Sequence, residues 1–527
     1  MKSKNFPWEL VVLSVIFVFL NVWTIKDGHN WGGDFSQYIR HAQNIVEHKS
    51  YSWSYDLEQK SISPPGFPLI LAPFLKIFGL NFPGLKSLNV FFWLLFVWCF
   101  YPLMRRSCGK DLALLGAAIL LTSPHFFIFK QNVLSDIPFL FFTTAGLLAW
   151  TEFAEHREEY SFRQHKWLLT AALFFTGYAT LVRWAGFVLF FLAGIYFLFS
   201  RRERKVCWPI LGALALTVLI QRIFESSYGY HVAEIQRPFT EWLMMSFDHT
   251  WSLLVAVLSI FFPIRTRLTE FLFANLTVVL VLGVALALPV VVGIFIQKFC
   301  KRSFSFLEHF SFFYLLALWF WYIPGGTGRY ALPIIGPLLI FFSQVVRQGV
   351  EWLRNRWGQV FKISGEYAVK VLFAGLILHN VISVTLVFSF DDDLIYQPTV
   401  KEMTAWVKHN TSEQDRFLFR EPRVFGLLTG RRGTSFDSYD FSGDLNQRLK
   451  QFSVNYIVFE KMNFHLEDER FNTEMLSRDF LGGKKHEFGV WGTDLFRQQI
   501  DPKQFAAEQV WENQGFRIMK ITPVSRR

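Results

Sequence analysis

Charged residues are scarce in this chain of 527 residues, and hydrophobic residues are abundant. Asp, Glu, Lys and Arg together make up 18% of the sequence, against 52% hydrophobic residues that include 62 phenylalanines. The apolar residues cluster in blocks near the ~20 residues that cross a bilayer. This pattern excludes one large soluble core and predicts a multi-pass α-helical membrane protein.

Cysteine is also rare. The four cysteines form no C-x-x-C pair, so the sequence offers no metal site of that spacing. They avoid the segments that we place on the outer side of the membrane, as expected of free thiols near an oxidising compartment. The net charge of +11 is not arranged as a basic stripe with interleaved aromatics, so no nucleic-acid partner is expected.

The apolar blocks predict about eleven spans. Their approximate limits are 8–25, 86–104, 111–128, 136–154, 167–182, 184–200, 207–223, 272–297, 305–323, 330–347 and 367–390. The first block is interpreted as an uncleaved span, because no small-residue cleavage site follows it. With a cytoplasmic N-terminus, the cytoplasmic connections are all rich in Lys and Arg, which agrees with the positive-inside rule. These connections are 105–110, 155–166, 201–205, 297–302 and 347–362.

We therefore place the chain in the cell (inner) membrane, with a transmembrane domain at 1–390 and a periplasmic or otherwise extracytoplasmic domain at 391–527. The outer side also carries loops at 26–66 and at about 224–271. Residues 66–80 are apolar but too short to span, which favours a helix lying in the membrane interface. Residues 251–262 are likewise too short and indicate a re-entrant or interfacial segment.

The last quarter of the chain has a different pattern. Residues 399–409 have the periodicity of an amphipathic helix, whereas 416–419, 454–460 and 515–521 are typical of buried strands. Alternating helix and strand patterns predict a small α/β domain. It has no GxGxxG sequence and no P-loop, and the TGRRG stretch is too short to predict a phosphate site.

The first outer loop begins with the stretch GGDFSQYIRHA, in which Asp34 stands at or next to a helix N-cap. A capping role alone would explain an aspartate there. Its position near the outer membrane surface, where a lipid head group lies, points to more. Tyr38 and His41 share its helical face, because residues four and seven positions on are neighbours.

A second acid, Asp136, lies in the stretch LSDIPFLFF at the outer mouth of another span. It could simply start a helix that has Pro138 in its first turn. However, an acidic side chain at the depth of the membrane costs free energy, and such residues usually have a function. Cations gather on the same side and suggest an anionic ligand, because arginine binds phosphate through paired hydrogen bonds. They are Lys60, Lys130, Arg183, Arg222, Arg237, Arg265, Arg267 and Arg329.

These features resemble the GT-C superfamily of integral-membrane glycosyltransferases, and more narrowly the bacterial relatives of protein mannosyltransferases and aminoarabinose transferases. The stretch GGDFSQYIRHA resembles the family's first-loop aspartate motif, and SPPGFPLILAPFLKIFG resembles its Pro-rich juxtamembrane helix. LSDIPFLFF resembles the second acidic motif, and GYATLVRWAG the arginine corner. GRYALPIIGPLLIF and an outer α/β tail complete the pattern.

The resemblance implies a polyprenyl-phosphate-linked sugar as donor and inversion at the transferred sugar. Asp34 would be the general base on an acceptor hydroxyl, and Asp136 would position the acceptor or a metal. Arg183, Arg329 and Lys60 would hold the donor phosphate. Tyr38, His41, His125 and Tyr330 are further candidates for substrate contacts. Metal dependence stays open, because Asp34, Asp136 and His125 are the only ligands in view for a divalent cation.

The chemistry suits these residue types without reference to any family. A carboxylate within hydrogen-bond reach activates a hydroxyl nucleophile, and fixed cations stabilise a departing phosphate. The main alternative is a transporter or flippase of lipid-linked sugars, although transporters place polar residues near mid-membrane. A non-catalytic partner in envelope assembly is a third. The sequence leaves open the sugar and the acceptor, which is a glycolipid, a polysaccharide or a protein.

Overall fold

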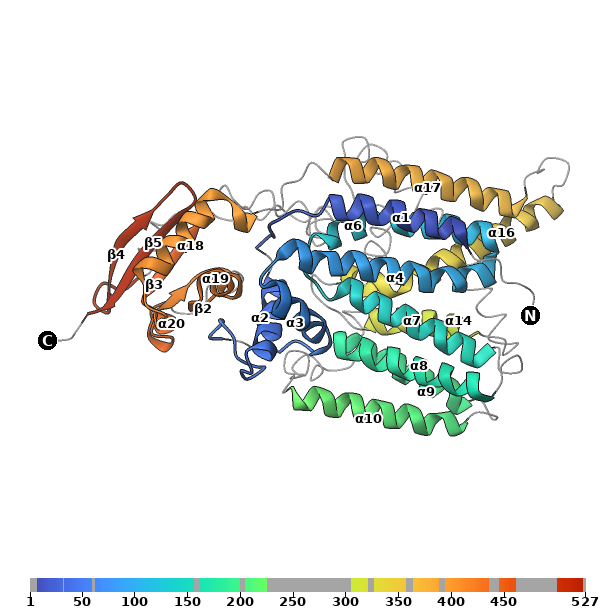
Figure 1. The fold of residues 1–527 in the computed structure, drawn as a ribbon, viewed down its shortest axis with the longest axis horizontal. Helices are drawn as coiled ribbons and strands as arrows, with labels where there is room; N and C mark the ends of the chain where they lie inside the picture. Colours follow the sequence, from blue (N-terminus) through green and yellow to red (C-terminus); the bar gives the residue numbers. More distant parts are fainter. Residues whose placement is uncertain are drawn as a thin grey trace.

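The structure, a computed structural model, describes residues 7–31, 33–58, 62–155, 162–199, 204–224, 305–320, 327–356, 364–387, 394–435, 445–460 and 500–524. Long helices run side by side through most of the molecule, and a unit of strands and short helices stands at one end (Figure 1). Two helices, α2 and α3, lie between the bundle and that unit. The predicted span at 272–297 and the predicted short segment at 251–262 lie outside the described residues.

Each predicted span within the described residues coincides with helical structure. The bundle helices are α1 (Trp8–Trp23), α4 (Phe82–Cys108), α5 (Lys110–Thr122), α6 (Pro124–Lys130), α7 (Asp136–Glu155), α8 (Phe162–Val182), α9 (Phe187–Phe199), α10 (Cys207–Ile223), α14 (Phe306–Phe320), α16 (Ile335–Arg356) and α17 (Gly365–Val387). Within the described residues, five helices are long and apolar enough to cross a membrane, or six if α5 and α6 form one span. The predicted total of eleven therefore stays a prediction.

Two predicted spans differ in detail from the structure. The span at 111–128 is broken between α5 and α6, whose axes differ by 46°. Ser123 stands at the break with φ −61° and ψ 121°, because the residue before a proline is disfavoured in the α conformation. The span at 330–347 continues as α16 to Arg356, so part of the predicted 347–362 connection is helical. The charged residues at this end are good helix formers, so the helix extends beyond the apolar block.

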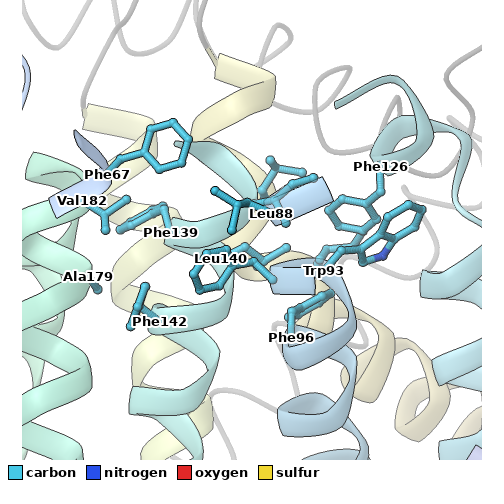
Figure 2. Packing of buried hydrophobic residues seen from close by; sticks show 14 of the residues in the cluster. Phe67, Leu88, Trp93, Phe96, Phe126, Phe139, Leu140, Phe142, Ala179 and Val182 are labelled. Atoms are coloured by element: carbon cyan, nitrogen blue, oxygen red, sulfur yellow. The ribbon is translucent and has the colours of Figure 1, made fainter. Parts of the chain in front are cut away.

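Aromatic side chains fill the bundle near the end that carries α2 and α3 (Figure 2). Trp93 and Phe96 of α4 pack against Phe126 of α6, with ring centroids 5.4 and 5.8 Å apart. Figure 2 shows Phe139 of α7 beside Val182 of α8, with Phe67 of α3 above them. These residues are at most 2% exposed, so they give the helix ends above them a rigid base.

The predicted interfacial helix is α3, Gly66–Phe78. One side is buried through Phe67, Leu71 and Leu75, whereas Ile77 and Phe78 near its end are 71% and 60% exposed. Pro65 precedes it, and Gly79 ends it with φ +62°, a conformation that glycine adopts without strain. An apolar end of this kind is suited to contact lipid.

The C-terminal unit contains a five-stranded mixed sheet in the order β2-β1-β3-β5-β4. The strands are β1 (Arg416–Leu418), β2 (Arg432–Thr434), β3 (Tyr456–Glu460), β4 (Phe505–Glu512) and β5 (Phe516–Pro523). β1 is parallel to β2 and β3, whereas β5 is antiparallel to β3 and β4. The helices are α18 (Pro398–Asn410), α19 (Pro422–Thr429) and α20 (Leu445–Gln451). The three predicted strands and the predicted helix are confirmed; β2 and β4 were not predicted.

The first outer loop joins this sheet at its β2 edge. Asp56 forms a parallel bridge with Gly433 of β2. The Gly433 amide donates to the Tyr55 carbonyl at 2.9 Å, and the Leu57 amide donates to the Gly433 carbonyl at 2.7 Å. Arg448 of α20 pairs with Glu58 at 2.9 Å. The first loop therefore packs against and hydrogen-bonds to the C-terminal unit, although the two are far apart in the sequence.

Candidate active site

Asp34 is the second residue of α2 (Gly33–Val46). This helix carries an unusual number of buried polar side chains, each of which needs a partner. Asn44 donates to the carbonyls of Tyr51 and Trp53, and the Arg40 guanidinium lies 4.2 Å from the centre of the Trp53 ring. The loop after α2 thus folds back over it. Asp34 differs from these residues, because 46% of its side chain remains exposed.

Asp136 is the first residue of α7 and is fully buried, with 0% of its side chain exposed. The segment just before it is fixed by the first loop, since the Val133 amide donates to Nε2 of His29 at 3.0 Å. Ser135 shares a hydrogen bond of 2.9 Å with the Tyr38 hydroxyl. These two bonds place Asp136 beside the face of α2 that carries Asp34.

Arg183 stands in a sharp corner between α8 and η2 (Trp184–Gly186), where its backbone is extended. The Gly186 amide donates to the Arg183 carbonyl at 2.9 Å, which closes the corner. A Cβ on Gly186 would lie 2.4 Å from the Thr180 nitrogen, so only glycine fits there. The corner turns the guanidinium inward, where it pairs with Asp136.

Arg329 of α15 (Thr327–Ala331) connects the two acids. Its Nη1 donates to Asp34 Oδ2 at 2.7 Å, while Nε and Nη2 donate to the two oxygens of Asp136 at 3.0 and 2.8 Å. The structure therefore brings together Asp34, Asp136, Arg183 and Arg329, as the sequence predicted. Two carboxylates and two guanidiniums balance in charge, which makes burial of the group tolerable.

The surroundings of Asp34 keep it ionised. Desolvation raises the pKa of its carboxyl, but attraction by the Arg329 guanidinium, with a smaller contribution from Arg423, outweighs that effect. The pKa of Asp34 therefore lies below its ordinary value. Partly exposed and ionised, this carboxylate can accept a proton, whereas the buried Asp136 is occupied by two guanidiniums.

A pocket of about 100 Å³ opens beside Arg183. Its polar lining includes Tyr38, Arg183, Tyr314 and Tyr330, and its apolar lining includes Val182, Val188 and Leu318. The Arg183 guanidinium lies 4.4 Å from the centre of the Tyr330 ring. The Tyr314 hydroxyl donates to the Tyr330 carbonyl at 2.8 Å. Desolvation raises the pKa of Tyr38 to about 12, so its hydroxyl stays protonated.

The other predicted contacts fall elsewhere. His41 is 1% exposed; its Nδ1 donates to the Tyr51 carbonyl at 2.8 Å, and its ring stacks on Tyr51. Its position therefore supports a role in holding the loop, against the predicted substrate contact. His125 is 4% exposed and packs on Phe129; it does not line the pocket, although it lies near enough to Asp136 for an electrostatic interaction. Lys60 lies outside the described residues. Lys130, predicted as an outer cation, is buried and donates to Asn21.

Two residues with clear roles in this geometry were not predicted. His29 donates to Asn30 through Nδ1, accepts from Val133, and stacks on Phe35 with ring centroids 3.6 Å apart. Desolvation lowers its pKa to about 3, so it is neutral. Arg423 of α19 reaches α2 from the C-terminal unit. A neutral buried histidine has no local sequence signature, and Arg423 is 389 positions from Asp34, too far for any spacing argument.

The donor set does not favour a metal ion at the two acids. Both oxygens of Asp136 and one oxygen of Asp34 already accept from guanidinium groups. Among the residues that the structure describes, no group of three or more His, Cys, Asp and Glu side chains is placed to hold a metal. A cation at this position would compete with Arg329, so the chemistry proposed below uses none.

Comparison with known proteins finds similarity in the first part of the chain. Residues 10–224 match the model of the dolichyl-phosphate-mannose-protein mannosyltransferase family. These residues include α2, both acids and the Arg183 corner. The chain is also 31% identical over 201 residues to an uncharacterized protein of Aquifex aeolicus (strain VF5). That match spans 37% of each of the two proteins.

Solved structures extend the likeness to nearly the whole chain. ArnT from Cupriavidus metallidurans, bound to undecaprenyl phosphate, aligns with a TM-score of 0.52 over 97% of both chains, at 11% identity. The oligosaccharyltransferase of Archaeoglobus fulgidus in its apo form aligns with a TM-score of 0.55, at 12% identity, over 87% of this chain and 70% of its own. Both are glycosyltransferases of the GT-C class.

The chain has a GT-C fold. The resemblance predicted from its motifs is thereby confirmed. A third GT-C structure, AglB from Archaeoglobus fulgidus with an inhibitory peptide and a dolichol-phosphate, aligns with a TM-score of 0.56 at 14% identity, over 99% of this chain and 74% of its own. At these identities the alignments establish the GT-C fold alone. The pairing of Asp34 and Asp136 with Arg183 and Arg329 is an observation on this chain's own structure.

Proposed function

We propose that the protein transfers a sugar from a polyprenyl phosphate to a hydroxyl group of an envelope acceptor, with Asp34 as general base. The observation that carries the proposal is the contrast between the two acids. Both bind Arg329, but Asp34 is 46% exposed and Asp136 is fully buried. One carboxylate is thus free to meet a substrate, while the other fixes the arginines.

The pocket beside Arg183 is suited to the donor's phosphate. Arginine binds phosphate through charge-assisted hydrogen bonds, and the protonated Tyr38 hydroxyl can donate another. The apolar wall of Val182, Val188 and Leu318 provides a surface for the first isoprene units. Two GT-C structures hold ligands of this kind, undecaprenyl phosphate in ArnT and dolichol-phosphate in AglB.

The proposed reaction is a single displacement. The acceptor oxygen attacks the anomeric carbon, and Asp34 takes the proton from that oxygen. The bond between the anomeric carbon and the phosphate oxygen breaks, and its electron pair leaves with polyprenyl phosphate. Attack opposite the leaving group inverts the anomeric configuration. Phosphate is already a good leaving group, so the second catalytic acid of a glycoside hydrolase is not needed.

The arginines contribute where charge develops. Negative charge gathers on the phosphate as the bond breaks, and a fixed guanidinium stabilises it without reorganisation. Arg183 can do this while Asp136 holds it in place, since one guanidinium has five N–H donors. Asp136 is accordingly a positioning residue for the arginines in our proposal, and this assignment replaces the expected role in positioning the acceptor or a metal.

The test is a transfer assay on the purified full chain. Radiolabelled undecaprenyl-phosphate mannose and undecaprenyl-phosphate aminoarabinose are offered in turn, with an envelope extract of glycolipids, polysaccharides and proteins as acceptor. We expect Asp34→Asn to lower the rate by at least about 10²-fold, in line with loss of a general base. Asp111→Asn, which changes the same charge in an exposed pair with Lys370, is the control and should be unaffected.

Full transfer by a folded Asp34→Asn protein would rule out the base assignment. Movement of labelled donor across vesicle membranes without any transferred sugar would instead favour a flippase. A labelled product identifies its acceptor class by extraction, because glycolipids enter organic solvent and proteins are digested by proteases.

A further inference from the structure

A cation from the C-terminal unit reaches the helix that carries Asp34. Arg423 is the second residue of α19, and its Nη1 donates to Oε1 of Gln37 at 2.8 Å. Gln37 lies three positions after Asp34 on α2, so both side chains are neighbours on the helix surface. Figure 1 shows α19 next to α2, at the junction between the unit and the bundle.

Gly33 makes room for this contact. A Cβ at Gly33 would lie 2.6 Å from Nη2 of Arg423 and 2.7 Å from a carboxylate oxygen of Glu421. The guanidinium therefore rests directly on the backbone of the residue before Asp34. Any other side chain at this position would push Arg423 and Glu421 away. The start of α2 and the start of α19 are thus fitted to each other.

Asp34 consequently has charged neighbours on two sides. From the bundle come Arg329 of α15 and Asp136 of α7. From the C-terminal unit come Arg423 and, beside Gly33, Glu421. Desolvation raises the pKa of Asp34, whereas Arg329 and then Arg423 lower it, so both cations favour the ionised form. The uncharged Tyr38 completes the surroundings on the same face of α2.

We propose that Arg423 is a positioning residue for Asp34, by which the C-terminal unit completes the active site. The inference rests on the proposed function, since it assumes that Asp34 is the general base. Arg329 holds one side of the carboxylate from within the bundle. Arg423 holds the start of α2 from the outside through Gln37 and the Gly33 backbone, and so keeps Asp34 in place beside Arg329.

Arg448 offers a matched control. It also joins the C-terminal unit to the first loop, through its ion pair with Glu58. That contact is made to the loop after α2 and involves neither Asp34 nor its helix. Arg423→Gln and Arg448→Gln therefore remove one cation each from the same junction, and only the first removes a neighbour of Asp34.

The first measurement needs no substrate. The folded full chain is labelled with a carbodiimide and glycine ethyl ester at a series of pH values, and modification of Asp34 is quantified by mass spectrometry. Carbodiimides react with the protonated carboxyl, so the pH midpoint of labelling reports its titration. We expect Arg423→Gln to raise this midpoint by roughly 0.5 unit, less than the ~1–3 units of a contacting charge. Arg448→Gln should leave it unchanged.

The second measurement is the pH dependence of kcat/KM for transfer from the donor that the wild-type protein uses. Arg423→Gln should move the acidic limb to higher pH by a similar amount and lower kcat about tenfold. Arg423→Lys keeps the charge, so it should keep the wild-type midpoint and recover part of kcat. A wild-type midpoint and a wild-type kcat in Arg423→Gln would overturn the inference.

The Asp34 and Arg423 variants together distinguish failure of the proposed function from failure of the role of Arg423. If Asp34→Asn is fully active, the proposed function fails, whatever Arg423 does. If Asp34→Asn is inactive and Arg423→Gln behaves as wild type, only the role of Arg423 fails. Should Arg423→Gln not fold, Gly33→Ala displaces the guanidinium with every charge retained. An unshifted Asp34 midpoint in folded Gly33→Ala would overturn the inference equally.

Discussion

At the scale of single residues, the site depends on how two acids and two arginines share their hydrogen bonds. Asp136 accepts from Arg183 and from two nitrogens of Arg329, and of these two arginines it is Arg329 that also donates to Asp34. The motif order along the chain was enough to predict these four residues, because each stands at the mouth of a span on one side. Their mutual pairing was not predictable, since spacing says nothing about which side chains meet.

Asp136→Asn should destabilise the protein strongly. Removing one partner of a buried ion pair typically costs about 3–5 kcal/mol, because the remaining charges are left uncompensated. We expect a clearly lower Tm in detergent, measured by intrinsic fluorescence. Asp111→Asn breaks a pair in which Asp111 is 65% exposed, and it should leave Tm unchanged. Equal melting of Asp136→Asn and wild type would contradict the pairing described for the buried site.

Arg183→Ala should weaken binding of the lipid product. A hydrogen bond to a charged group contributes roughly 1.5–3 kcal/mol, so Kd for undecaprenyl phosphate should rise by about tenfold or more. The measurement is a titration of undecaprenyl phosphate into the detergent-solubilised protein, followed by tryptophan fluorescence. Arg354→Ala, which removes a cation from the end of α16, is the control. An unchanged Kd in Arg183→Ala would remove this residue from the phosphate site.

At the scale of elements, α2 and the first loop are the least ordinary part of the fold. The periodicity of α2 was visible in the sequence, but its environment was not. A helix with Ser36, Gln37, Arg40, His41 and Asn44 buried would be assigned to a solvent-facing surface by composition alone. It is buried because the loop after it and α19 supply its partners, and such tertiary contacts override local pattern.

Acid should destabilise α2 and the first loop around it. Desolvation lowers the pKa of His29 to about 3 and that of His41 to about 4, against an ordinary value of 6.5. Between the ordinary pKa and these lower values, the unfolded segment binds protons that the folded segment does not. The free energy of unfolding the segment therefore falls as the pH drops below about 6.5. Amide hydrogen exchange at 33–46, corrected for intrinsic rates, should therefore increase between pH 7.5 and pH 5.

His29→Gln and His41→Gln are the checks on that expectation. A glutamine does not titrate in this range, so the acid-induced increase in exchange should shrink in each variant. An identical pH response in the double variant would show that other groups dominate. The bundle helix α10, which contains no histidine, provides an internal reference within the same measurement.

At the scale of the whole molecule, specific contacts join the C-terminal unit to α2 and the first loop. The sheet accepts Asp56 at its β2 edge, and Arg448 and Arg423 contact the loop and α2. The sequence predicted a transmembrane part and an α/β tail, and it located three of the five described strands. It could not predict that they meet next to Asp34, at Gln37 and Gly33. That contact joins residues hundreds of positions apart and depends on the absence of a side chain at Gly33.

The pairing of Asp56 with β2 has a consequence for biogenesis. The first loop emerges from the ribosome early, whereas Gly433 and Arg423 are made almost 400 residues later. Until then, the polar face of α2 lacks part of its cover, and the candidate base lacks one of its two neighbouring cations. A nascent chain would accordingly transfer sugar poorly until synthesis is nearly complete, and truncation before residue 423 should yield a membrane-inserted protein with a kcat no higher than that of Arg423→Gln.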